Sequence, residues 1–163
     1  MSRVCALAPA AHLVFVMQHP GPAVGVLLGF FGLLGTGKKI KLRTKDVFFK
    51  PDKAGMVLNL GGTKGGKQKG VTEYVVVDDV TTMWAVLYWL QGRHPEALFV
   101  DCAPAVWRKL FIAAIAALNL GSPDLRPYSL RRGGATDMFT STGSLALAMG
   151  RGRWVAHGAI VLG

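Results

Sequence analysis

Two adjacent arginines, Arg131 and Arg132, stand in a segment whose residue types suit the binding of an anion. They follow a turn at Pro127, and a proline at this place predicts that a helix begins there. A guanidinium at the start of a helix is well placed to bind an oxyanion, because its planar fork matches phosphate geometry. The small residues 133–135 come next, so another surface could approach closely. The segment therefore predicts a phosphate-binding site.

The charge of the chain points to a polyanionic partner. Its formal net charge is +10, which favours nucleic acid first and an acidic membrane surface second. Residues 35–73 hold ten Lys or Arg and three Asp or Glu, a net of +7, and residues 122–163 have a net of +3. Hydrophobic residues make up 51% of the chain, which argues against a disordered protein. The excess charge therefore belongs to two stretches of a folded domain.

The hydrophobic pattern indicates the elements that must position these charges. An irregular or weakly helical segment is expected over 1–22, followed by one domain over 23–163. Helices are predicted over 23–34, 38–43, 79–90, 103–118, 128–141 and 144–149. Strands are predicted over 46–50, 56–60 and 72–77, in sequence, which favours an antiparallel meander. The expected fold class is α+β, a mostly helical domain with a small three-stranded antiparallel sheet.

Taken in order, these elements and motifs resemble the catalytic domain of tyrosine recombinases of the phage-integrase type, over roughly residues 24–163. The segment 31–38 is similar to the family's first arginine box, with Gly35 at the arginine position and Lys38 at the glutamate position. Lys64, between the second and third strands, matches the family's hairpin lysine. The resemblance implies a fold typical of enzymes that break and rejoin DNA.

The C-terminal part carries the rest of the resemblance. Tyr128-Ser129-Leu130-Arg131 is similar to the family's His-x-x-Arg box, with Tyr128 in place of the histidine. About twenty residues later, Trp154 matches the family's His or Trp position. The tyrosine nucleophile of the family stands nine residues beyond that position, where this chain has Gly163.

The resemblance implies a chemistry and a set of site residues. In the family a tyrosine attacks the scissile phosphate, two arginines stabilise the transition state, and the lysine is the general acid. The catalytic residues implied here are Arg131, Lys64, Tyr128 and Trp154, with no metal and no cofactor. Because Gly35 and Gly163 lack the side chains the chemistry needs, we expect little or no strand transfer.

Double-stranded DNA is the expected partner, contacted mainly through its phosphates. The expected DNA-binding residues are basic and flank the arginine motif: Lys38, Lys39, Lys41, Arg43, Lys45, Lys67, Lys69, Arg132, Arg151 and Arg153. The family acts as a tetramer on DNA, so a homo-oligomer on DNA is implied. We expect the protein inside the cell with the DNA, in the nucleus if the source is eukaryotic.

Other interpretations stay open. The chain could be a non-catalytic DNA-binding remnant of a mobile element, or Arg131 and Arg132 could simply pair with Asp124 or Asp137 on the surface. It could also be a small membrane-associated protein anchored by residues 4–37, which contain no Asp, Glu, Lys or Arg. Prolines interrupt that run, and its unbroken apolar part, 23–34, is shorter than the roughly 20 residues of a membrane span. A membrane partner is therefore not favoured.

Overall fold

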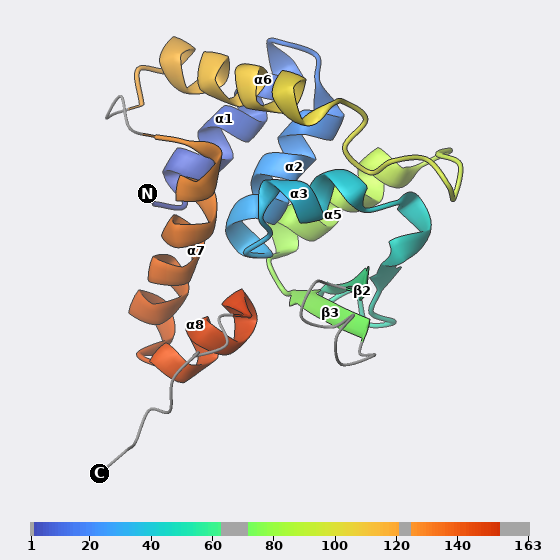
Figure 1. The fold of residues 1–163 in the computed structure, drawn as a ribbon, viewed down its shortest axis with the longest axis vertical. Helices are drawn as coiled ribbons and strands as arrows, with labels where there is room; N and C mark the ends of the chain where they lie inside the picture. Colours follow the sequence, from blue (N-terminus) through green and yellow to red (C-terminus); the bar gives the residue numbers. More distant parts are fainter. Residues whose placement is uncertain (1, 63–71, 121–124, 154–163) are drawn as a thin grey trace.

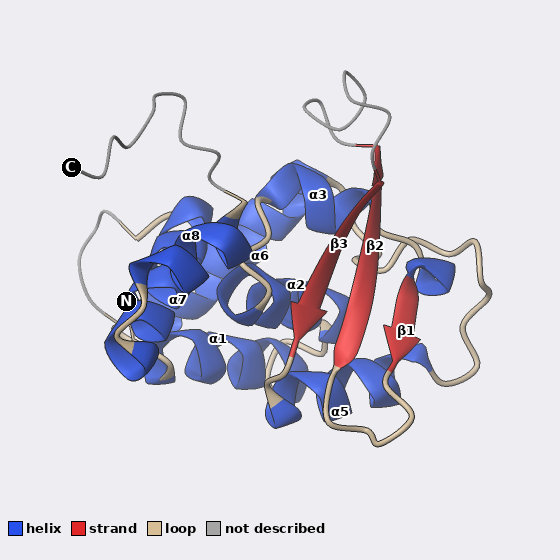
Figure 2. Ribbon diagram, turned by 90° about the horizontal axis from the view of Figure 1, so that it is seen from below, coloured by secondary structure: helices blue, strands red, loops and turns tan. Residues whose placement is uncertain are grey.

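The computed structural model describes residues 2–62, 72–120 and 125–153 (Figures 1 and 2). In chain order its elements are α1 (Val4–Phe15), α2 (Pro20–Phe31), α3 (Thr36–Lys41), η1 (Thr44–Asp46), β1 (Val47–Phe49), β2 (Met56–Gly62), β3 (Thr72–Val77), α5 (Val80–Leu90), α6 (Pro104–Ala117), α7 (Pro127–Thr142) and α8 (Leu145–Gly152). The predicted fold class is confirmed: the domain is mostly helical and has one three-stranded antiparallel sheet.

The sheet is the predicted meander, with strand order β1-β2-β3 and both pairings antiparallel. Val47 lies opposite Leu58, and Leu58 lies opposite Val75, so these three side chains share one face. All three are buried. Figure 2 shows the sheet standing beside the helices. The alternation of the strands therefore places one face of the sheet against the core.

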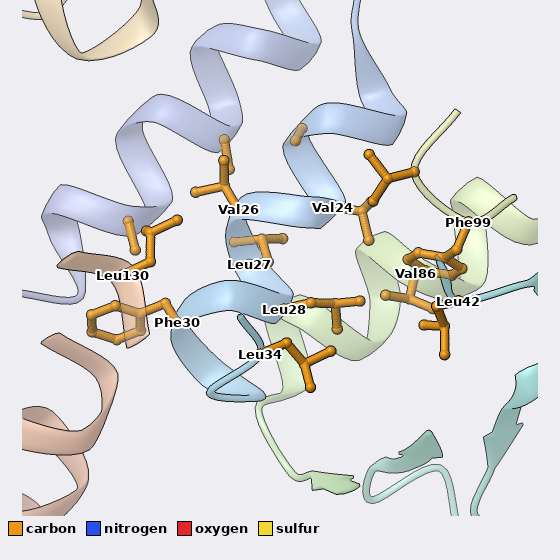
Figure 3. Packing of buried hydrophobic residues seen from close by; sticks show 14 of the residues in the cluster. Val24, Val26, Leu27, Leu28, Phe30, Leu34, Leu42, Val86, Phe99 and Leu130 are labelled. Carbon is orange, nitrogen blue, oxygen red and sulfur yellow. The ribbon is translucent and has the colours of Figure 1, made fainter. Parts of the chain in front are cut away.

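Helix α2 is the centre of the core. Its residues Gly21 to Phe30 are all buried, and it has neighbours in α1, α3, α5, α6 and α7. A helix that is apolar on every side is stable only when other elements surround it. Figure 3 shows side chains of α2 among Leu42, Val86, Phe99 and Leu130, which come from other parts of the chain. The prediction of a buried helix over 23–34 is confirmed, with its start moved to Pro20.

Of the two possibilities expected for residues 1–22, irregular or weakly helical, the helical one holds over Val4–Phe15. Residues Val4–Phe15 form α1, and the boundary expected after residue 22 falls inside α2. Pro9 removes one backbone donor from α1, and its ring crowds the preceding turn of the helix. Burial of Ala6, Ala10 and Leu13 against the rest of the core outweighs that loss. Because α1 packs on α2 and α6, this region belongs to the same core as the rest of the described chain.

Several predicted helix boundaries are confirmed by their capping residues. The carboxylate of Asp79 accepts a hydrogen bond from the backbone N–H of Thr82 at 2.8 Å and begins α5. The hydroxyl of Ser144 accepts from the N–H of Leu147 at 3.2 Å and begins α8. Gly143 ends α7 with φ 68°, in the left-handed region that glycine enters without strain. The sequence positions of α5, α7 and α8 follow from these local signals.

The run without Asp, Glu, Lys or Arg over 4–37 does not form one long helix. It contains two helices of 12 residues each, α1 and α2, which pack against each other. In the part of the chain that the structure describes, no helix has the length and apolar character needed to cross a membrane.

Candidate functional site

The approach of α7 to α2 brings the arginine motif to the turn that follows α2. A Cβ atom at Gly134 would lie 1.9 Å from the carbonyl oxygen of Phe30 and 2.7 Å from Cδ2 of Leu33. Only glycine allows the two helices to come this close. The expectation that small residues after Arg132 permit a close approach is confirmed. Figure 1 shows the result: α7 runs beside α2, and α8 lies at its far end.

Arg131 lies one turn into α7, with a half-buried side chain. Its Nη2 donates a hydrogen bond to the carbonyl oxygen of Gly152, the last residue of α8. A Cβ atom at Gly35 would lie 3.9 Å from Nη1 of Arg131. The two positions matched to the arginines of the recombinase family are therefore neighbours in space, although one of them is a glycine here.

Arg153 adds a second guanidinium to this place. It follows α8 with φ 53°, and its Nη2 donates to the carbonyl oxygen of Leu33 at 3.2 Å, next to the turn that holds Gly35. Its Nε lies 3.8 Å from Oε2 of Glu73 on β3. Burial lowers the pKa of Arg153, the nearby charge of Arg131 lowers it further, and Glu73 acts in the opposite direction. The two guanidinium groups are thus close enough for their charges to interact.

Arg151 links α8 to the sheet. Its Nη1 donates to the carbonyl oxygen of Val76 at 2.9 Å, and its Nη2 lies 2.6 Å from Oδ2 of Asp78. Nζ of Lys50 lies 2.8 Å from the other oxygen of this carboxylate. Partial burial acts to raise the pKa of Asp78, but the hydrogen bonds from Lys50 and Arg151 outweigh it and leave that pKa below its ordinary value. Much of the charge of Arg151 is therefore compensated within the protein.

The prediction that Lys39 belongs to an exposed DNA-binding surface is wrong, because its side chain is fully buried. Its Nζ lies 3.6 Å from the centroid of the Trp107 ring and has no hydrogen-bond partner among the described residues. The reason is that α3 turns this side chain toward α2 and α6, where Gly29 leaves room for the amine. Lys39 does not belong to the exposed basic surface.

The other described basic residues differ in exposure and in the ion pairs that they form. Arg132 and Lys41 are exposed, and Lys38 is half-buried. Nη1 of Arg43 lies 3.2 Å from Glu96, and Nζ of Lys45 lies 2.5 Å from the same carboxylate. These last two cations therefore share one anion at the loop after α5.

Tyr128 and Asp137 lie on the same helix as Arg131. Tyr128 lies one turn before Arg131 on α7 and is 57% exposed, so its hydroxyl is accessible to a ligand. Asp137 pairs with Arg3 at 3.0 Å, so this carboxylate has a partner other than the arginine motif. Lys64, Lys67, Lys69, Trp154, Gly163 and Asp124 lie outside the described residues.

Some members of the site carry no signal in the sequence. The acceptors that hold Arg131, Arg151 and Arg153 include three main-chain carbonyls, which every residue type possesses. No sequence motif marks Asp78 or Glu73 as a partner of these arginines. Among the described residues no group of three or more His, Cys, Asp or Glu is placed to hold a metal ion.

No family model matches this chain, and no curated protein matches it. Among solved structures, the fold is similar to that of the XerH site-specific recombinase in a pre-cleavage complex with its difH substrate. The TM-score is 0.71 at 12% sequence identity, over 98% of this chain and 47% of the recombinase chain. The chain thus spans about half the length of that recombinase. At this level of identity the similarity establishes the fold.

Proposed function

We propose that this chain is a DNA-binding domain built on the tyrosine-recombinase catalytic fold. In this proposal it binds duplex DNA through its phosphates and transfers strands weakly or not at all. Arg131 is the central phosphate-binding residue, and Arg132, Arg153 and the exposed lysines of α3 add charge around it. Lys64, Tyr128 and Trp154 remain proposed members of the same site.

The observation that carries the proposal is the position of Arg131. Its guanidinium is half-buried, its Nη2 is held by an uncharged carbonyl oxygen, and Gly35 lies beside its Nη1. A main-chain carbonyl orients the guanidinium and carries no negative charge of its own. Arg153 lies nearby and strengthens the local positive potential. A backbone phosphate has the geometry and charge that such a place would bind.

Weak or absent catalysis follows from two glycines. Gly35 stands where the family has its first arginine, and loss of one charge-stabilising donor costs on the order of 3 kcal/mol in the transition state. Gly163 stands at the position of the nucleophile, and glycine has no side chain that could form a covalent intermediate. Binding needs neither group, so it would survive where strand transfer would not.

The first experiment measures binding of the full chain to a fluorescent mixed-sequence duplex by anisotropy, from 50 to 300 mM salt. The logarithm of the binding constant should fall linearly with the logarithm of the salt concentration, by about 0.9 for each phosphate contacted. Changing Lys64, Lys67 and Lys69 together to alanine should weaken binding and flatten this slope. Absence of binding at 50 mM salt would contradict the proposal.

The second experiment tests the chemistry with a nicked suicide duplex, which traps a covalent protein–DNA adduct. We expect no adduct in a denaturing gel. An adduct would show that another tyrosine, Tyr74, Tyr88 or Tyr128, acts as the nucleophile, and the proposed loss of catalysis would then be wrong.

A further inference from the structure

Lys39 is the most unusual charged residue of the described chain. It lies on α3, a helix of six residues, and its side chain is fully buried although its neighbours Lys38 and Lys41 reach the surface in part or in full. Lysine is almost never fully buried unless its amine is paired. Here the amine has no hydrogen-bond partner among the described residues.

Side chains and backbone of α2, α6 and α7 enclose the amine of Lys39. Trp107 on α6 presents its ring face 3.6 Å from Nζ, and Nε1 of that ring donates to the carbonyl oxygen of Pro22 at 3.1 Å, which fixes the ring. On α2, a Cβ atom at Gly29 would lie 2.9 Å from Nζ, so the glycine provides the space. The same Cβ would lie 3.1 Å from Leu130 of α7, which closes the site on the third side.

No counter-ion is available to a protonated Lys39 in these elements. Helices α2, α3 and α6 contain no Asp or Glu. The charged residues on α6 are Arg108 and Lys109, and those on α7 are Arg131, Arg132 and Asp137, whose carboxylate pairs with Arg3. α3 itself adds only Lys38 and Lys41. On the described residues of α2, α3, α6 and α7, the one acidic side chain is thus Asp137, which already has a partner.

These conditions favour the neutral amine in the folded protein. One aromatic ring offsets only part of the cost of removing an ammonium from water. Burial accordingly lowers the pKa of Lys39 well below its ordinary value. A proton on this side chain must either unfold the site or move the amine to solvent.

Helix α3 is the element that can detach from the core when Lys39 is protonated. It is too short to be stable alone, and its N-cap residue Gly35 has no side chain to cap it. Its only buried residues are Lys39 and Ile40. When the amine of Lys39 leaves Trp107, α3 keeps Ile40 as its one buried side chain.

We propose that Lys39 is a protonation-controlled switch of α3. With a neutral amine, α3 packs on α2 and α6, and protonation releases α3 together with the adjoining Gly35 turn. Because Gly35 faces Arg131, acidification would disorganise one side of the arginine site without unfolding the rest. This switch can be tested without DNA.

The first test is the pH dependence of urea unfolding of the full chain between pH 6 and pH 10. A group that is neutral when folded and protonated when unfolded makes the folded state more stable as pH rises, by up to tenfold in the unfolding constant per pH unit. Lys39→Met keeps the packing and should lose this component. Lys41→Met, on the exposed side of the same helix, is the matched control and should keep it. Equal pH slopes in wild type and Lys39→Met overturn the proposal.

The second test locates the motion by amide hydrogen exchange. The ratio of exchange rates between wild type and Lys39→Met at Ile40 and Lys41 removes the intrinsic effect of pH on exchange. This ratio should rise at least tenfold from pH 9 to pH 6, while the corresponding ratio for α5 stays constant. A ratio at α3 that does not change, or an equal change in α5, overturns the proposal.

A third measurement needs only the wild-type chain, in case the variant does not fold. The ¹⁵N chemical shift of the Lys39 side-chain nitrogen distinguishes an amine from an ammonium. We expect the shift of a neutral amine for Lys39 at pH 9. An ammonium shift for Lys39 at a pH where the α3 amides are still protected from exchange overturns the proposal.

Discussion

The guanidinium of Arg131 on α7 donates a hydrogen bond to the carbonyl oxygen of Gly152 at the end of α8. The next residue, Arg153, donates to the carbonyl oxygen of Leu33 in the turn between α2 and α3. Three segments that are distant in sequence are therefore joined by two arginines through uncharged acceptors. Both side chains organise the site, so experiments must separate the structural role from the binding role.

Arg131→Met separates these roles when it is compared with Arg132→Ala. Loss of a hydrogen bond from a charged donor should lower the free energy of unfolding by about 1.5–3 kcal/mol. Duplex affinity should fall, and the salt slope should decrease by about 1 if one phosphate contact is lost. Arg132 is exposed on the same helix, so its removal should change the salt slope while stability stays within about 0.5 kcal/mol. Urea unfolding and fluorescence anisotropy give the two readouts, and wild-type affinity of Arg131→Met would refute the proposed phosphate contact.

Gly35→Arg should restore a second guanidinium beside the first. The position accepts a side chain, because its φ is −67° and its Cβ would make an ordinary contact 3.9 Å from Nη1 of Arg131. Duplex affinity should rise and the salt slope should steepen by about 1. Repulsion from Arg131 should cost about 1 kcal/mol of stability or less.

The control for this gain is Gly37→Arg, which adds the same charge to the same helix. A Cβ at Gly37 would have no heavy atom within 4 Å, whereas a Cβ at Gly35 would lie 3.9 Å from Nη1 of Arg131. If position 35 belongs to a phosphate site, Gly35→Arg gains more affinity than Gly37→Arg. Equal gains in the anisotropy titration would mean that only net charge matters.

The fold could be predicted where local chemistry decides the structure. Asp79, Ser144 and Gly143 mark helix ends through their own hydrogen bonds or backbone angles, and β3 follows from its β-branched residues. Helix α1 could not be predicted in this way. Its stability comes from burial against α2 and α6, and Pro9 gave the opposite local signal.

The candidate site, like the fold, contains features that the sequence could predict and features that it could not. The proximity of Gly35 and Arg131 could be anticipated from the order of the motifs, because the resemblance assigns both to one site. The burial of Lys39 could not, since it depends on Trp107 and Gly29, which lie on other helices. The carbonyl acceptors of the three arginines also had no signal, because a main-chain oxygen is the same for every residue type.

Gly134→Ala should destabilise the protein strongly. The added methyl group would lie 1.9 Å from the carbonyl oxygen of Phe30, so α2 and α7 would have to move apart. We expect a loss of about 3 kcal/mol or more in the free energy of unfolding. Gly150→Ala is the control, because a Cβ at this exposed position of α8 would meet nothing within 4 Å. That change should stabilise by up to about 1 kcal/mol, and equal effects in urea unfolding would contradict the close approach of α2 and α7.

The carboxylate of Asp78 should make a small, pH-dependent contribution to the free energy of unfolding. Its ion pair with Arg151 connects α8 to the residue that follows β3. Its pKa is lowered by Lys50 and Arg151, so this stability is complete above the ordinary value of 3.8 and is lost as pH falls through the lower folded value. Because the side chain is 43% exposed, solvent limits the contribution to about 0.5–1 kcal/mol. A double-mutant cycle of Asp78→Asn with Arg151→Met, followed by urea unfolding, should give a coupling of this size at pH 7. The coupling should weaken as pH falls below 3.8 and the carboxyl takes up a proton, and a coupling that does not change with pH would exclude the ion pair as its source.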